Sequence, residues 1–119
     1  MNRFRSKRSR FQGTNYRSVL EHCWAEFLTA AGLEYRYEVQ RFRLGRLSYL
    51  PDFYLCDLRL FLEIKPLWPT VEELTLCRLL SIRLAQPILL AVGKPTVAEV
   101  LEFRGDEVGI RGLLEMLGL

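Results

Sequence analysis

The sequence predicts a single α/β domain in which helices flank a mixed β-sheet. Residues 16–31 have the apolar spacing of an amphipathic helix, residues 35–65 read as strands, and residues 71–92 join a second helix to a buried strand. With 119 residues, half of them hydrophobic, the chain can bury one sizeable core but not two. The expected order of elements is helix, three strands, helix, strand.

The first helix is expected to run from Tyr16 to Ala31. Thr14 or Asn15 can cap its start, and Gly32 is typical of a residue that ends a helix. Glu21 lies at the edge of the apolar face, from which its carboxylate can reach a neighbouring sheet. The apolar face consists of Tyr16, Leu20, Cys23, Trp24, Phe27, Leu28 and Ala31.

Three strands are expected next. Residues 35–39 alternate between aromatic or apolar and polar side chains, which is the period of a strand. A basic segment, residues 41–46, leads to apolar strands near 48–55 and 59–65. The connection between these two strands, residues 56–58, is short enough to make them an antiparallel hairpin.

A second helix is expected from Val71 to about Leu84. Pro66 ends the preceding strand, and Thr70 suits the N-cap position of the helix. Glu72 and Glu73 fit its first turn, where acidic side chains interact favourably with the helix dipole.

The C-terminal part of the chain is expected to add strands to the sheet. Residues 87–92 are apolar on both faces and are followed by Gly93, as expected of a buried parallel strand reached through a helical crossover. Residues 97–103 are predicted as a further strand, and residues 113–117 as a short terminal helix.

Positive charge is concentrated at the N-terminus. Six of the 17 basic residues and none of the 14 acidic residues lie in the first 17 positions, so the net charge of +3 hides a strongly basic segment. Residues 1–14 are therefore predicted to form a flexible arm attracted to nucleic-acid phosphates, and residues 15–119 a single domain. The alternative is a tail that only aids solubility. The basic residues of the arm expected to contact DNA are Arg3, Arg5, Lys7, Arg8 and Arg10.

Several classes of protein are not expected from this composition. No apolar run approaches the roughly 18 residues that span a bilayer, and no signal-peptide segment follows the basic start. We therefore expect a soluble, cytoplasmic protein without membrane contact. Cys23, Cys56 and Cys77 form no C-x-x-C pair, and the single His22 completes no Cys/His cluster, so neither a disulfide framework nor a zinc site is predicted.

Three charged residues interrupt the predicted hairpin. Side chains alternate along a strand, so Glu63 and Lys65 share a face, and hairpin pairing can bring Asp52 beside Glu63. Two carboxylates in a partly dry site repel each other unless a cation lies between them. Lys65 can neutralise only one, whereas Mg²⁺ would suit both carboxylates and the backbone carbonyl of Ile64. The alternative is a structural salt bridge from Lys65 to one of the two acids.

These residues carry a family resemblance. Pro51-Asp52, eleven positions before Glu63-Ile64-Lys65, with Glu21 on the preceding helix, resembles the active-site signature of the PD-(D/E)xK phosphodiesterase superfamily. The resemblance covers residues 16–93 and implies a restriction-endonuclease-like αβββαβ core with a mixed central sheet between helices. The stretch 16–66 is also similar to small uncharacterised nucleases of phages and other mobile elements.

The resemblance implies a role for each site residue. Asp52, Glu63 and the carbonyl of Ile64 would bind Mg²⁺, for which Mn²⁺ can substitute. Lys65 would assist the attacking water, and Glu21 would contact a second metal or its water.

The implied activity is that of a metal-dependent endonuclease that hydrolyses phosphodiester bonds in duplex or branched DNA. The second helix lacks the Gln-x-x-x-Tyr pattern of the exonuclease branch, which disfavours an end-processing enzyme. So small a chain offers little surface for reading a DNA sequence, and we expect that cutting a duplex or branched structure needs a homodimer or a partner subunit. Further candidate DNA contacts are Arg41, Arg43, Arg46 and Arg78. The alternative is a catalytically silent nucleic-acid-binding or assembly protein with the same fold.

Overall fold

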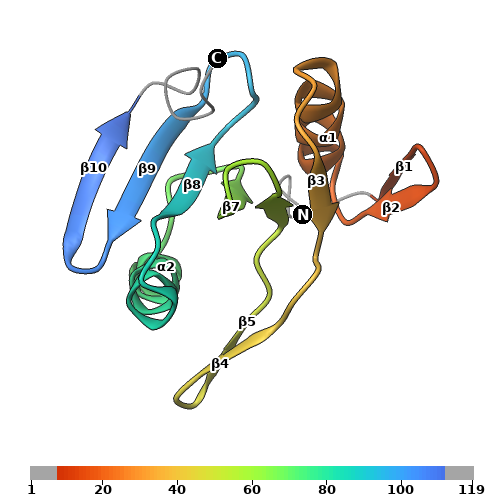
Figure 1. The fold of residues 1–119 in the computed structure, drawn as a ribbon. Coiled ribbons are helices and arrows are strands. Elements are labelled where there is room, and N and C mark those ends of the chain that lie inside the picture. The colour runs from red at the N-terminus through yellow and green to blue at the C-terminus, as the bar shows by residue number, and fades with distance from the viewer. Residues whose placement is uncertain (1–7, 112–119) are drawn as a thin grey trace, which may run out of the picture.

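The computed structural model describes residues 8–111. Its centre is a six-stranded sheet in the order β10-β9-β8-β7-β6-β3, with α1 (Val19–Ala30) and α2 (Val71–Leu84) on opposite faces (Figure 1). β7 and β8 are parallel, and the other four neighbouring pairs are antiparallel. The strands are β3 (Tyr35–Tyr37), β6 (Phe53–Leu55), β7 (Leu60–Lys65), β8 (Ile88–Val92), β9 (Glu99–Arg104) and β10 (Glu107–Arg111).

Two small hairpins lie outside this sheet. β1 (Ser9–Phe11) pairs with β2 (Thr14–Tyr16) ahead of α1, and β4 (Phe42–Leu44) pairs with β5 (Leu47–Tyr49) between β3 and β6. Figure 1 shows them projecting from the body of the sheet.

The predicted α/β class is confirmed. If only the helices and the strands of the central sheet are considered, the expected order of helix, three strands, helix and strand corresponds to α1, β3, β6, β7, α2 and β8. The antiparallel β6–β7 hairpin, the parallel β8 and the strand predicted over 97–103, now β9, are all present. The helix predicted over 113–117 lies outside the described residues.

The start of the first helix was predicted wrongly. α1 begins at Val19 with Ser18 as its N-cap, whose hydroxyl accepts from the Glu21 N–H at 3.1 Å. Tyr16 instead ends β2 and is buried, because the Gln12-Gly13 turn, with φ of 48° and 81°, folds the chain back as a hairpin. Residues 9–14, assigned from the sequence to the flexible arm, are thus part of a paired structure.

The strand predicted over 48–55 is divided. Residues 50–52 belong to no strand and separate β5 from β6. Pro51, which has no N–H to donate, lies in this break. The basic segment 41–46 becomes most of the β4–β5 hairpin, whose turn holds Gly45 at φ 63°.

Two apolar layers form the core, one on each face of the sheet. On one face Trp24 and Leu28 of α1 belong to the same buried cluster as Leu62 of β7. On the other face Cys77 and Leu80 of α2 belong to a cluster with strand residues of β7, β8 and β9. Because side chains alternate along β7, Glu63 and Lys65 face the α2 side.

The start of α2 was predicted correctly. Thr70 is the N-cap, its hydroxyl accepts from the Glu73 N–H at 3.2 Å, and the Glu73 carboxylate accepts from the Thr70 N–H at 2.9 Å. This reciprocal capping box fixes both the helix start and the Glu73 side chain. No helix within residues 8–111 is long and apolar enough to cross a membrane.

Leu62 tests the packing of the central strand. Leu62→Ala removes a fully buried side chain from β7 and is expected to lower the free energy of unfolding by about 3 kcal/mol. Leu67→Ala, at a half-exposed position, should change it by less than about 0.5 kcal/mol. Urea unfolding of the two variants makes the comparison, and equal losses would contradict the assignment of Leu62 to the core.

Candidate functional site

Asp52 and Glu63 meet at the end of the β6–β7 hairpin, as the sequence predicted. The register pairs Phe53 with Leu62, which places residue 52 opposite residue 63. The Asp52 N–H donates to Glu63 Oε1 at 3.0 Å, and the Ile64 N–H donates to Asp52 Oδ2 at 2.7 Å. The two residues, called the carboxylate pair below, are only 8% and 7% exposed.

The position at which β6 begins explains this arrangement. β6 pairs with β7 only up to Phe53, whereas β7 continues to Lys65. The Asp52 side chain therefore takes the place of a strand partner for the Ile64 N–H. In an extended strand the N–H and C=O of one residue point to the same side, so the Ile64 carbonyl also faces the space beyond β6.

Burial and mutual repulsion shape the electrostatics of the pair. Burial, followed by the charges of Glu63 and Glu21, raises the pKa of Asp52 well above its usual range. Burial also raises the pKa of Glu63, even though Lys65 and the bonds from Asp52 act in the opposite direction. Ionising both groups therefore costs free energy unless a cation neutralises them.

Lys65 lies beside the pair but is bound more closely by another acid. Its Nζ is 3.5 Å from Glu63 Oε2 and 2.7 Å from Glu73 Oε2 on α2. Burial works against the charged lysine, but the bond to Glu73 and the charges of Glu63 and Glu73 raise its pKa overall. From the sequence, Glu73 was recognised only as a first-turn acid, because its contact depends on how α2 folds back against β7.

Glu21 is near the pair without joining it. The Tyr37 hydroxyl of β3 donates to Glu21 Oε1, and the charge of Glu21 contributes to the raised pKa of Asp52. The Glu38 N–H donates to the Asp52 carbonyl at 2.8 Å. The start of α1 and the residue that follows β3 thus lie near Asp52.

The residues fit a hard divalent cation in part. Two buried carboxylates that lack full charge compensation, with a backbone carbonyl beside them, supply oxygen donors of the kind that Mg²⁺ prefers. Within residues 8–111 no three His, Cys, Asp or Glu side chains converge as a ready metal-binding cluster. Because Mg²⁺ usually keeps several waters and takes only one or two carboxylates, this donor set is compatible with it.

Tyr49 of β5 is buried in the apolar cluster on the α2 side of the sheet and was not predicted as a site residue. It is buried, and its hydroxyl lies 3.6 Å from Cys77 Sγ on α2. Burial, followed by the charge of Glu63, raises the pKa of Tyr49 well above its usual range. Tyr49 lies between Ser48 and Leu50 in a run expected to form a strand, and nothing in the sequence marks it as a site residue.

The predicted DNA-contacting arginines are spread over several elements. Arg41, Arg43 and Arg46 are exposed on the β4–β5 hairpin, which reaches the site through Tyr49. Arg78 is paired with Asp106 of the β9–β10 turn at 2.7 Å. Arg8 and Arg10 are exposed at the β1–β2 hairpin, and Arg3, Arg5 and Lys7 lie outside the described residues.

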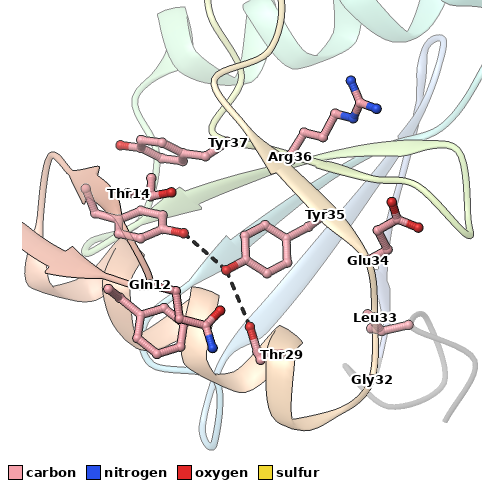
Figure 2. Close-up of a pocket in the computed structure, with 11 residues that line it drawn as sticks. Gln12, Thr14, Thr29, Gly32, Leu33, Glu34, Tyr35, Arg36 and Tyr37 are labelled. Carbon is pink, nitrogen blue, oxygen red and sulfur yellow. Dashed lines mark hydrogen bonds between the residues drawn. The ribbon is translucent and has the colours of Figure 1, made fainter.

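A separate cavity of about 630 Å³ lies between the β1–β2 hairpin, the end of α1 and β3 (Figure 2). Figure 2 shows the side chain of Tyr35 pointing toward Thr29. The Thr29 hydroxyl donates to the Tyr35 hydroxyl at 3.4 Å, and the Tyr35 and Tyr16 hydroxyls are 3.1 Å apart. None of its lining residues belongs to the carboxylate pair. Tyr37, at one end of the cavity, is the link to the site through its bond to Glu21.

The chain matches no protein-family model, no curated protein and no solved structure. Function is therefore argued from the site itself.

Asp52→Asn tests the charge burial. The pKa values of Asp52 and Glu63 are higher in the folded state than in the unfolded state, so the folded state binds their protons more tightly. Protonation of the two acids therefore stabilises the fold most below about pH 4, and this stabilisation is lost as the pH rises through the pKa values of the folded state. Asparagine removes the buried charge and keeps an acceptor for the Ile64 N–H. At pH 8 in EDTA the variant should melt roughly 5 °C higher.

Asp57→Asn is the matched control, because Asp57 is an exposed acid in the β6–β7 turn. Thermal unfolding monitored by circular dichroism should show little change for it. A lower melting temperature for Asp52→Asn at pH 8 would mean that the Asp52 charge is compensated in the fold.

Proposed function

We propose that the protein is a Mg²⁺-dependent DNA endonuclease of the PD-(D/E)xK type. The observation that carries the proposal is the buried pair of Asp52 and Glu63, held by crossed hydrogen bonds with Lys65 at its edge. A structural salt bridge would account for one acid and one lysine, but it leaves the second buried acid without a counter-charge.

The proposed fold relationship has support from topology. The elements α1, β3, β6, β7, α2 and β8 follow the αβββαβ order implied by the sequence motif. The acidic residues lie where β6 begins beside the central strand β7, and the helix that follows supplies the capping box beside Lys65.

Each residue has a distinct task in the proposed reaction. Asp52, Glu63 and the Ile64 carbonyl would hold Mg²⁺, which when bound supplies charge stabilisation for the phosphate and lowers the pKa of a water. The Lys65 ammonium would orient the attacking water and offset negative charge as it develops on the phosphate oxygens. Glu21, oriented by Tyr37, would accept a hydrogen bond from water at the edge of the site.

DNA would reach the site across the β4–β5 hairpin. Arg41, Arg43 and Arg46 are exposed there, and Arg8 and Arg10 provide a second positive surface at the N-terminal hairpin. Phosphate contacts of this kind position a duplex without reading its sequence. Cutting both strands would require a second active site, supplied by a homodimer or a partner subunit.

Cleavage assays test the proposal directly. The protein should nick supercoiled plasmid or a four-way junction in Mg²⁺ or Mn²⁺ but not in EDTA. Asp52→Ala and Lys65→Ala should each reduce the rate on the order of 100-fold or more, because each removes a group that stabilises the transition state. Asp57→Ala and Lys94→Ala, at exposed positions, serve as charge-matched controls.

An absence of cutting, together with DNA binding that is the same in EDTA and in both site variants, would support a catalytically silent binding protein instead. Gel-shift measurements on the same samples provide this comparison.

The basic arm should contribute to DNA affinity through counterion release. Replacing Arg3, Arg5 and Lys7 with glutamine is expected to reduce the slope of log binding constant against log salt concentration by up to about 3. Lys94→Gln, a single change outside the arm, is the control. A slope unchanged by the triple substitution would assign the arm to solubility rather than to DNA.

A further inference from the structure

Lys65 stands between two carboxylates that hold it unequally. Its Nζ lies 2.7 Å from Glu73 Oε2 and 3.5 Å from Glu63 Oε2. Charge-assisted N–H···O bonds are usually about 2.7–2.9 Å long, so the contact with Glu73 is a full hydrogen bond and the contact with Glu63 is not. The ammonium is thus drawn toward α2 and away from the carboxylate pair.

Glu73 is itself held in place by the helix start. Its Oε1 accepts from the Thr70 N–H at 2.9 Å, while its own N–H donates to the Thr70 hydroxyl at 3.2 Å. One carboxylate oxygen therefore belongs to the capping box and the other to Lys65. A side chain bonded at both oxygens keeps its direction, so the pull on Lys65 is built into the fold.

The position of Lys65 determines what Glu63 can bind. Glu63 Oε1 is occupied by the Asp52 N–H, and Oε2 is the oxygen that faces Lys65. Without Glu73, Glu63 Oε2 would be the nearest acceptor for the ammonium. A direct ion pair there would compete with a divalent cation for the same oxygen.

We propose that Glu73 is a positioning residue that keeps Lys65 from closing on Glu63 and so leaves Glu63 free to bind the metal. The inference rests on the proposed nuclease function and adds a residue to it from outside the motif. Both oxygens of Glu73 are already bonded within the fold, so its effect on the cation is exerted through Lys65.

Metal binding to the free protein tests this role independently of cleavage. Calorimetric titration of the metal-free protein with Mn²⁺ should show about fivefold weaker binding for Glu73→Gln than for the natural protein. Glutamine keeps an oxygen for the Thr70 N–H but loses the charge that binds Lys65. Glu72→Gln removes the same charge from the exposed neighbouring position and should change the affinity by less than about twofold.

A double-variant cycle identifies the route of the effect. In the Lys65→Met background the Glu73→Gln change should alter Mn²⁺ affinity by less than about twofold, because the competing ammonium is gone. An equal loss with and without Lys65 would overturn the proposal, as would equal losses for Glu73→Gln and Glu72→Gln. If Glu73→Gln does not fold, Glu73→Asp, whose shorter side chain draws the carboxylate away from Lys65, takes its place, with Glu72→Asp as its matched control. Equal losses for Glu73→Asp and Glu72→Asp, or an equal loss with and without Lys65, would again overturn the proposal.

The two proposals fail in different ways. A natural protein that binds no Mn²⁺ and cuts no DNA would overturn the nuclease function and this inference together. A natural protein that binds Mn²⁺ and cuts DNA, with a Glu73→Gln variant of unchanged affinity, would overturn the inference alone.

Discussion

β6 begins only at Phe53, opposite Leu62, whereas its antiparallel neighbour β7 continues to Lys65, so the backbone of β7 must find other hydrogen-bond partners in a buried place. Asp52 supplies one such partner and is held in turn by a side chain of β7. Its carboxylate accepts from the Ile64 N–H, and its own N–H donates to the Glu63 side chain. The two acids are therefore brought together by hydrogen bonds to backbone groups. The site depends on this substitution of a side chain for a missing strand partner.

The pairing of the two acids could be predicted from the sequence, whereas the start of α1 and the contact between Lys65 and Glu73 could not. The spacing of Asp52 and Glu63 in two apolar runs with a short connection was sufficient to predict their pairing, because a hairpin has few possible registers. Tyr16 fits the helical period with Leu20 as well as it fits the end of a strand, so the start of α1 could not be read from periodicity. The contact between Lys65 and Glu73 spans a turn with two prolines, and only the folded path of residues 66–69 brings them together.

The carboxylate pair illustrates a conflict between stability and chemistry. Apolar residues at positions 52 and 63 would pack in this layer without the cost of burying charge. Because burial raises the pKa of both acids, retaining them there is expected to lower stability at neutral pH. The surrounding structure can tolerate it because β7 is covered on both faces and flanked by β6 and β8.

Hydrogen bonds at Gly93 connect the end of β7 to α1. The Gly93 N–H donates to the Lys65 carbonyl at 2.9 Å, and the Trp24 indole N–H of α1 donates to the Gly93 carbonyl at 2.9 Å. α2 thus holds the side chain of Lys65, while α1, through Gly93, holds its backbone. Strand ends usually fray, but opening this one would break bonds to side chains of both helices. The Gly93 amide should accordingly exchange its hydrogen with solvent as slowly as amides in the middle of the sheet, and the end of β7 would move with the core.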